Sequence, residues 1–456
     1  MTQVSHLIFR EYDVRGVVGE DVTADVAVLL GRAFGSQVQF DLGLASPMVV
    51  VGHDNRLSSE GLAEAYAEGL RSTGARVLQV GLVPTPALYF AVKHFGGDAG
   101  AQITGSHNPP EYNGFKMLTA GGPFYGKAIQ QLRERIESKD FAEGNGRIQE
   151  RPVLDAYIDD VVGRFRLERP VRVVIDCGNG AASLAAVSML ERIGASVDAL
   201  YCESDGSFPN HHPDPTVDEN LVELIERVRS TAAEVGIAFD GDADRIGAVD
   251  ENGKIVRGDY LLLIYALDAL KRNPGEQVIF DVKCSQVLED EIAKAGGCPI
   301  MWKTGHSLIK EKMRETGAKI AGEMSGHMFF GDDYHGYDDA LYSACRLVDV
   351  VARSGGPLSG LLEGVPELAS TPEIRVDCSD DAKFQIVGRA VEHFKQRYDV
   401  IDVDGARVRM EDGWALIRAS NTQPILVLRV EAGTEARLEA IRDELYGWLG
   451  AQGLVI

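Results

Sequence analysis

The chain has 456 residues, which is long enough for roughly three or four domains of ordinary size. Its formal net charge of −23 argues against general binding to nucleic acid or to an anionic membrane, so we expect neither as a partner. An anionic ligand would have to be held by a local group of cations, against this overall charge.

The six cysteines occur without a C-x-x-C pair, and each lies in or near an apolar run. We therefore expect free thiols in the cores of a cytoplasmic protein rather than a disulfide framework. The segment 1–10 lacks the apolar centre of a secretory signal. The most apolar stretch, 260–270, is too short to cross a bilayer and contains Asp268.

A pattern of strand, loop, helix, glycine and strand occurs three times along the chain. The first copy runs from a buried strand at 47–52 to a strand at 77–80, and the others begin with strands at 171–176 and 277–281. Three copies predict three related α/β domains with largely parallel sheets. Ligand-binding loops in such sheets follow the carboxyl ends of the strands.

The last part of the chain has a different pattern. After residue 371 we expect helices at about 382–397 and 434–449, and strands near 400–403, 408–410, 414–417 and 425–430. This order predicts a smaller antiparallel α+β domain. Polar or proline-containing stretches separate the units, so the expected domains are 1–150, 151–254, 255–367 and 368–456.

The segment 104–116 contains the run Ser106-His107-Asn108-Pro109-Pro110 and follows a predicted strand at 99–103. Gly105 gives the backbone freedom beside Ser106, and the two prolines prevent an immediate helix. We expect Ser106 on a rigid, irregular loop of the kind that often carries reactive groups. A polar surface turn is the alternative. Neighbouring side chains rarely face each other, so His107 is not an obvious activating base.

Asp240, Asp242 and Asp244 follow a predicted strand at 235–239. Alternate residues of an extended segment point the same way, so the three carboxylates can converge. A hard divalent cation would relieve their repulsion, and Mg²⁺ is the usual one with phosphate substrates. Arg245 beside them could bind an anionic group. The alternatives are an EF-hand, which requires glycine where Arg245 stands, and a solvated acidic turn.

Two further loops combine small polar side chains with charge. The segment 322–327 brings a carboxylate, a hydroxyl and an imidazole together, which suits recognition of a sugar's hydroxyls. The segment 418–424 combines Arg418 with three small polar residues and resembles a phosphate-binding nest. Lys283 follows a strand, and Arg15 beside Gly16 is either an anion ligand or a solvated surface arginine. Surface turns remain the alternative for both loops.

These motifs, in this order, resemble those of the α-D-phosphohexomutase superfamily. The resemblance covers essentially the whole chain and includes the segment 9–16, read as Phe-Arg-Glu-Tyr-Asp-Val-Arg-Gly. Gly105 before Ser106, together with Gly-Glu-Met-Ser-Gly-His at 322–327, is most similar to the bacterial phosphomannomutase/phosphoglucomutase branch. The phosphoglucosamine mutase branch usually has glutamine where Met324 stands.

The resemblance implies four domains around one cleft and reversible phosphoryl transfer between hexose 1-phosphate and hexose 6-phosphate, of mannose, glucose or both. Ser106 would carry the phosphate, and a hexose 1,6-bisphosphate would be the intermediate and activator. Ser106, Asp240, Asp242 and Asp244 would hold Mg²⁺. A phosphoglucosamine mutase, a metal-dependent sugar phosphatase and a non-catalytic sugar-phosphate-binding protein are the alternatives.

The resemblance also implies roles for the remaining residues. The expected catalytic residues are Ser106, Arg15, His107, Lys116, Arg245, Lys283 and His327. The expected substrate-binding residues are Tyr12, Gly305, His306, Glu323, Ser325, His327, Arg418, Ser420, Asn421 and Thr422. His327 and Lys116 are candidates for the general acid or base, and Glu323 and Ser325 would bind the 3- and 4-hydroxyls. We expect a monomer with a hinge in 365–371.

Overall fold

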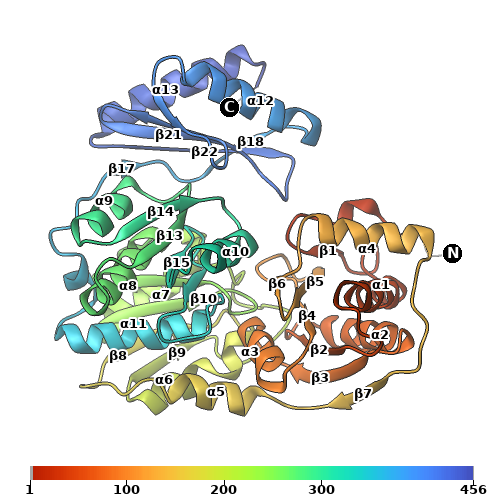
Figure 1. Ribbon diagram of the computed structural model, residues 1–456. Helices are drawn as coiled ribbons and strands as arrows, with labels where there is room; N and C mark the ends of the chain where they lie inside the picture. The colour runs from red at the N-terminus through yellow and green to blue at the C-terminus, as the bar shows by residue number, and fades with distance from the viewer. Residues whose placement is uncertain (1–3, 455–456) are drawn as a thin grey trace.

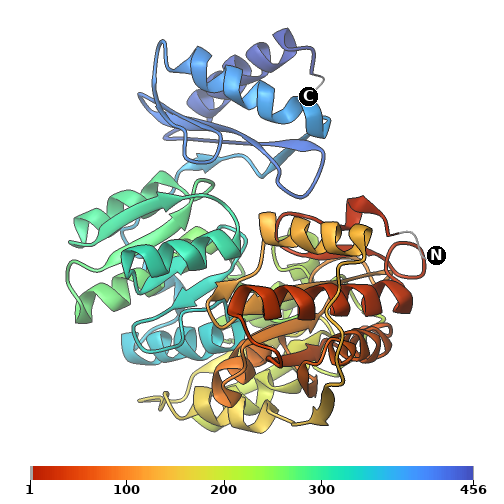
Figure 2. The ribbon, with the colours of Figure 1, turned by 45° about the vertical axis from the view of Figure 1, so that its right-hand side comes forward.

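The computed structural model describes residues 4–454, so the first three residues of the segment 1–10 lie outside it. The chain folds into four lobes, each built on its own sheet, which we call domains 1 to 4 in chain order (Figure 1). Domain 4 lies above the other three domains in both views (Figures 1 and 2). This arrangement brings loops from all four domains toward one central region.

Domain 1 has a seven-stranded sheet in the order β1-β5-β4-β2-β3-β7, with β6 beside β5. Its strands are β1 (Val14–Val17), β2 (Met48–His53), β3 (Arg76–Leu82), β4 (Ala99–Ile103), β5 (Tyr112–Thr119), β6 (Gly122–Pro123) and β7 (Arg147–Glu150). Its helices are η1 (His6–Ile8), α1 (Ala24–Leu42), α2 (Ser59–Ser72), α3 (Thr85–Phe95) and α4 (Lys127–Ser138).

The centre of this sheet is parallel, but β5 runs antiparallel to both β4 and β1. The expected loop at 104–116 is therefore shorter than predicted, because β5 begins at Tyr112 and contains Lys116. Gly16 lies within β1. β1 and β5 pair with each other from distant parts of the chain, which local sequence does not reveal.

Domain 2 has a sheet in the order β12-β11-β10-β8-β9, parallel across β9, β8 and β10 and antiparallel beyond. Its strands are β8 (Arg172–Asp176), β9 (Ser196–Leu200), β10 (Val235–Phe239), β11 (Ile246–Asp250) and β12 (Ile255–Val256). Its helices are α5 (Leu154–Val162), η2 (Ala181–Leu184), α6 (Ala186–Ile193), η3 (Asp218–Leu221) and α7 (Val222–Thr231). Because β12 pairs with β11, this sheet extends two residues beyond 254.

Domain 3 repeats the pattern with a four-stranded sheet in the order β14-β13-β15-β16. Its strands are β13 (Gln277–Asp281), β14 (Cys298–Trp302), β15 (Ile320–Gly322) and β16 (Met328–Phe330). Its helices are α8 (Gly258–Arg272), α9 (Gln286–Lys294), α10 (His306–Thr316), α11 (Ala340–Ser354) and η4 (Leu358–Leu362). The strands β14, β13 and β15 are parallel, and β16 is antiparallel to β15.

Domain 4 differs from the others because all its strand pairs are antiparallel. Its strands are β17 (Ala369–Ser370), β18 (Ile374–Asp377), β19 (Asp399–Ile401), β20 (Ala406–Met410), β21 (Gly413–Ala419) and β22 (Ile425–Ala432). Its helices are α12 (Asp380–Phe394) and α13 (Glu435–Ala451). The expected fold class of three α/β domains followed by an α+β domain is confirmed.

Domains 2 and 3 share one continuous hydrophobic core, in which Tyr157 of α5 and Tyr265 of α8 are both buried. Leu88 and Phe90 of α3 join that core from domain 1. Domain 4 has a core of its own, and Trp414 packs with Val282 at the border with domain 3. Domains 2 and 3 are therefore built on a common core, while domain 4 is attached at its edge.

All six cysteines are free. Five are buried or half-buried, but Cys298 is exposed, in contrast to the expected core position. It begins β14, which is an edge strand of its sheet. Among residues 4–454, no helix is both long and apolar enough to cross a membrane.

Candidate active site

Ser106 lies just beyond β4 and is buried, with 2% of its surface exposed. Its backbone is left-handed, with φ of +49°, which few residues other than glycine adopt. Its Oγ donates to Asp240 Oδ2 at 3.0 Å and lies 3.2 Å from His107 Nδ1. Side chains alternate only along extended backbone. His107 therefore faces Ser106, although adjacent residues were not expected to face each other.

His107 is held in the neutral form. Burial, together with the positive charges of Arg245 and Arg15, lowers the pKa of His107 well below its usual value. A neutral imidazole beside a serine hydroxyl can accept a proton from it. His107 is therefore a third candidate for proton transfer, beside His327 and Lys116.

Gly105 has a different role from the one expected. Its φ is not in the left-handed region, and Ser106 itself takes the unusual conformation. A Cβ at position 105 would lie 2.5 Å from Cζ of Arg56, which is too close for any real contact. Glycine is needed here because the Arg56 guanidinium packs directly against the backbone.

The acidic loop between β10 and β11 is a tight turn, where an extended segment was expected. Asp240 Oδ1 accepts the backbone N–H groups of Asp244 and Arg245 at 3.0 and 3.1 Å. Ala243 has a φ of +62°, which helps to close the turn. Asp240, Asp242 and Asp244 are fully buried, and each offers an oxygen within 4.8 Å of the others. The carboxylates converge because the turn is tight rather than by strand alternation.

Lys116 of β5 reaches this loop from domain 1. Its Nζ donates to Asp242 Oδ2 at 2.6 Å and to Asp244 Oδ2 at 2.5 Å. Burial opposes the charged ammonium, but Asp242 and Asp244 outweigh it and raise the pKa of Lys116. Lys116 is therefore a fixed cation that cannot accept a proton, so only the acid half of its expected role as general acid or base stays a prediction.

The three carboxylates carry more negative charge than Lys116 neutralises. Burial and the charges of Asp242 and Asp244 raise the pKa of Asp240 well above its usual value. Asp242 Oδ1 is buried and has no hydrogen-bond partner within residues 4–454. Closely spaced carboxylate oxygens with a spare acceptor are the donor set that Mg²⁺ prefers. The residues present therefore fit a divalent cation.

Thr85 also holds the acidic loop, and sequence reasoning missed it. It begins α3, and its N–H donates to the Asp242 carbonyl oxygen at 2.9 Å. Its Oγ1 donates to Asp242 Oδ2 at 2.5 Å. The flanking prolines, Pro84 and Pro86, predict only a helix start. Nothing in the local sequence indicates a contact with a loop 157 residues away.

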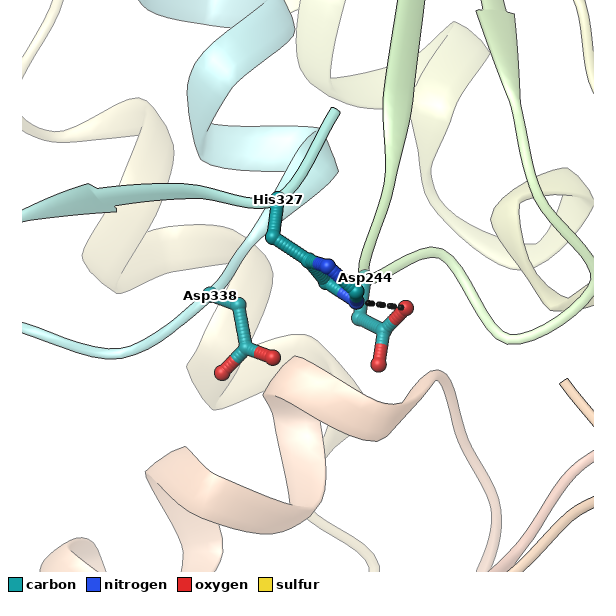
Figure 3. Close-up of side chains that lie close together, drawn as sticks. All are labelled: Asp244, His327 and Asp338. Atoms are coloured by element: carbon teal, nitrogen blue, oxygen red, sulfur yellow. Dashed lines mark ion pairs between the residues drawn. The ribbon is translucent and has the colours of Figure 1, made fainter. Parts of the chain in front are cut away.

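His327 connects the acidic loop with the loop at 322–327 (Figure 3). Its Nε2 lies 3.3 Å from Asp244 Oδ1, and its Nδ1 lies 3.0 Å from Glu323 Oε2. Burial lowers the pKa of His327, but the charge of Asp244 outweighs it, so the pKa rises to about 9. The ring is therefore cationic at neutral pH. Asp338 lies beside it and pairs with Lys310 at 2.8 Å.

The remaining predicted cations fall into two groups. Arg15 of β1 pairs with Asp13, and Arg245 Nε lies 3.3 Å from His327 Nε2. Arg15 and Arg245 interact electrostatically with each other and with the acidic loop. Lys283 donates instead to Glu373 Oε2 at 3.2 Å, across the border between domains 3 and 4. Lys283 also interacts electrostatically with Arg418 and Glu323, which belong to the two predicted substrate-binding loops.

The substrate-binding candidates of domain 3 are held by one another. Glu323 Oε1 accepts the Gly305 N–H at 2.6 Å, and Ser325 Oγ lies 3.1 Å from His327 Nδ1. The His306 ring centroid lies 5.4 Å from that of His327. Gly305 has a φ of +135°, and a Cβ there would lie 2.5 Å from Cζ of Tyr12. Glycine therefore makes room for a tyrosine from domain 1.

The loop of domain 4 reaches the same region from above. Arg418 Nε donates to Asp404 Oδ2 at 3.1 Å, and Ser420 Oγ accepts the Thr422 N–H at 3.3 Å. Asn421 Nδ2 donates to Tyr12 Oη at 2.7 Å. Tyr12 Oη in turn donates to the Thr304 carbonyl oxygen at 2.8 Å. The four sequence motifs thus meet where the four domains converge.

Comparisons with known proteins agree across the chain. Models of the phosphoglucomutase/phosphomannomutase family match residues 6–143 for α/β/α domain I, 155–253 for domain II, 257–368 for domain III and 373–447 for the C-terminal domain. A phosphomannomutase/phosphoglucomutase from Pseudomonas aeruginosa is 47% identical over 437 residues, covering 95% of this chain and 94% of that protein.

Solved structures show the same similarity. A phosphoglucomutase/phosphomannomutase family protein from Burkholderia thailandensis superposes with a TM-score of 0.92 at 44% identity, and 98% of each chain is covered. The N-acetylphosphoglucosamine mutase of Aspergillus fumigatus, solved with GlcNAc-6P and magnesium, has a TM-score of 0.64 at 12% identity. It covers 98% of this chain and 96% of its own, and it shares the fold.

Proposed function

Because the chain belongs to the phosphoglucomutase/phosphomannomutase family and has the enzymatic activity of that family, we propose that Ser106 carries the transferred phosphoryl group. The reaction interconverts hexose 1-phosphate and hexose 6-phosphate. The phosphoserine gives its phosphoryl group to the free hydroxyl of the sugar phosphate, and the resulting hexose 1,6-bisphosphate returns the other phosphate to Ser106. The proposal takes its main support from Ser106 Oγ, which lies 3.0 Å from Asp240 in the buried acidic cluster.

Each transfer needs a cationic and well-ordered surrounding more than a strong base. The sugar hydroxyl oxygen attacks phosphorus and gives its proton to a basic side chain. The bond from phosphorus to Ser106 Oγ breaks, and Oγ takes up a proton, so the serine hydroxyl is restored. Lys116, Arg15 and Arg245 stabilise the charge that spreads over the phosphoryl oxygens. His107 and His327 are the proton-transfer candidates, the first neutral and the second protonated at neutral pH.

Asp240, Asp242 and Asp244, with a phosphoserine oxygen, would hold Mg²⁺. The ion supplies charge neutralisation at the phosphoryl group. The magnesium in the solved Aspergillus fumigatus mutase supports this choice of metal.

The substrate is a phosphosugar, and its two ends contact different domains. Glu323 and Ser325 bind sugar hydroxyls, while Arg418, Ser420, Asn421 and Thr422 hold the phosphate that is not reacting. Mannose and glucose differ at C2, and no residue of the site is assigned to that position. Competition kinetics with mannose 1-phosphate, glucose 1-phosphate and glucosamine 6-phosphate will rank the three sugars.

Intact mass spectrometry with a serine variant tests the proposal. The purified protein should carry the mass of one added phosphate, which Ser106→Ala removes together with mutase activity. Ser58→Ala, in the same domain, serves as the control that keeps both. Mutase activity undiminished in Ser106→Ala would exclude the phosphoserine route. Steady release of inorganic phosphate without isomerisation would instead indicate a metal-dependent phosphatase built on the same acidic cluster.

A further inference from the structure

Arg56 follows β2, and its side chain is completely buried beneath the loop that carries Ser106. The guanidinium donates to backbone carbonyl oxygens at three positions of that loop and at the first residue of β5: Nη1 to Pro109 at 2.6 Å and Tyr112 at 2.9 Å, and Nη2 to Ser106 at 2.7 Å and Asn108 at 2.6 Å. One side chain thus contacts the backbone at several points between β4 and β5.

These carbonyl groups have few other ways to be satisfied. The loop is irregular, so these carbonyls lack the regular partners of a sheet, although the Pro109 oxygen also accepts the Tyr112 N–H at 3.0 Å. Buried backbone groups without partners are costly. Only arginine presents a planar fork of five N–H donors, whereas lysine offers three donors at a single point. Arg56 therefore replaces the hydrogen bonds that regular secondary structure would provide.

The charge of Arg56 is already neutralised, so its role is not to bind an anionic ligand. Asp54 Oδ2 lies 3.4 Å from Arg56 Nε, and Asp54 Oδ1 accepts the Arg56 backbone N–H at 3.0 Å. Asp54 Oδ2 also accepts the Thr104 hydroxyl at 2.6 Å. The pair and its partners form one connected network beneath the loop that carries Ser106.

The network also fixes the unusual backbone of Ser106. Its left-handed φ of +49° is uncommon for serine. The Ser106 carbonyl is held by Arg56, and the Ser106 N–H donates to Thr104 Oγ1 at 2.8 Å. Both peptide groups next to the reactive hydroxyl are therefore tied to the Arg56–Asp54 network.

We infer that Arg56 is a positioning residue for phosphoryl transfer, which keeps the Ser106 loop in one conformation whether or not the serine is phosphorylated. The inference rests on the proposed function, in which Ser106 gains and loses a doubly charged group in every cycle. A displacement of about 1 Å in a reacting group can cost roughly a hundredfold in rate. Arg56 would prevent such a displacement while its four contacts stay unchanged.

The test compares Arg56→Lys and Arg56→Met with Leu62→Ala. Leu62 is buried in the domain 1 core and makes none of the loop contacts, so its variant controls for a general loss of stability. We expect both Arg56 variants to lower kcat about a hundredfold with KM nearly unchanged, because domains 3 and 4 supply the sugar and distal phosphate contacts. The phosphoserine should also lose phosphate to water faster in these variants.

Two further measurements separate positioning from simple structural support. In Arg56→Ala, added guanidinium ion at non-denaturing concentration should restore part of kcat, while urea at the same concentration should not. If the Arg56 variants fail to fold, Gly105→Ala addresses the same contact, because its Cβ would fall 2.5 Å from the guanidinium carbon. It keeps Arg56 but displaces the fork, and kcat should fall while KM is retained.

The outcome that overturns the inference is an unchanged kcat per folded molecule, as for Leu62→Ala, with no faster hydrolysis. Wild-type protein is measured first by intact mass. Absence of phosphate on wild-type Ser106 removes the proposed function, and this inference with it. A phosphorylated wild type with unaffected Arg56 variants overturns the positioning role alone.

Discussion

The two halves of the candidate site are built differently. We call them the reacting end, which consists of the Ser106 loop and the acidic loop, and the gripping end, which consists of the loop 418–424 and Tyr12. At the reacting end, Ser106, Lys116 and Asp242 are buried, and bonds cross from domain 1 to domain 2. At the gripping end, Asn421 and Thr422 are only half-buried, and Asn421 contacts domain 1 through the Tyr12 hydroxyl. In the proposed reaction, phosphoryl transfer requires fixed geometry. The hexose 1,6-bisphosphate must also present its other phosphate to Ser106, which requires a contact that can be released.

Domain 4 is attached mainly to domain 3. Arg407 is fully buried and donates to the carbonyl oxygens of Val282 and Cys284 at 2.6 and 2.7 Å. The hinge expected at 365–371 stays a prediction, but the structure limits the residues at which it could lie. β17, at Ala369–Ser370, already pairs with β22, so movement would occur before residue 369.

The largest expected effect is at the reacting end, with Asp242→Asn. A metal supplies several kcal/mol of charge stabilisation, and a loss of about 4 kcal/mol lowers kcat roughly a thousandfold. Steady-state kinetics will measure kcat, and calorimetry will measure the affinity for Mg²⁺. Asp155→Asn, at an exposed position of α5, is the control. A variant that binds Mg²⁺ weakly but keeps its rate would show that the acidic loop does not act through a metal.

At the gripping end, we expect Arg418→Ala to have a smaller effect, which is on KM rather than on kcat. Hydrogen bonds to charged groups contribute about 1.5–3 kcal/mol, so KM for the sugar phosphate should rise roughly 10- to 100-fold. The phosphate on Ser106, measured by intact mass, should be retained. Arg389→Ala, on the outer helix of the same domain, should change neither value. Loss of the phosphoserine in Arg418→Ala would contradict separate roles for the reacting end and the gripping end.

The sequence predicted the fold well because its main signals are local. Buried strands and glycine-ended helices recur in the three α/β units, and the tail lacks that repeat. β5 escaped prediction because it follows Pro109 and Pro110 and pairs on both sides with strands that are distant in sequence or reached through an irregular loop. Sequence spacing alone could not supply these partners.

Contacts between distant residues were even harder to predict in the candidate site. Residues that carry unusual chemistry in a compact motif, such as the acidic loop and Ser106, could be selected from the sequence by residue type. Thr85 and Arg56 could not, because their neighbours in the sequence are ordinary and their partners lie far along the chain. His107 was undervalued because the left-handed backbone of Ser106 could not be foreseen.

Thr85 provides a matched test of how rigidly the reacting end is held. Thr85→Val removes the hydroxyl that donates to Asp242 Oδ2 with little change of shape, and Thr85→Ser keeps it. Partners that orient a metal ligand typically change metal affinity 10- to 100-fold when they are removed. We expect the Mg²⁺ dissociation constant, from calorimetry, to rise within that range for valine and to stay near the wild-type value for serine. Equal values for both variants would show that the hydroxyl does not orient Asp242.

The smallest expected effect is that of Tyr12→Phe, which removes the hydroxyl between Asn421 and the Thr304 carbonyl. The ring remains against Gly305, so shape is retained. A neutral hydrogen bond is worth about 1 kcal/mol, and KM should therefore rise roughly fivefold at constant kcat. Tyr66→Phe is the control, because the buried Tyr66 hydroxyl has no hydrogen-bond partner within residues 4–454.

The kinetic signature of Tyr12→Phe decides whether the two ends are independent. If the hydrogen bond between Asn421 and Tyr12 only helps to hold the substrate, KM rises, while kcat and the phosphate on Ser106 stay unchanged. A fall in kcat as large as the rise in KM would mean that domain 4 must stay in contact with domain 1 for Ser106 to react. The reacting end would then depend on the contact between domains 4 and 1 as well as on its own buried hydrogen bonds. It would be rigid only while that contact is made.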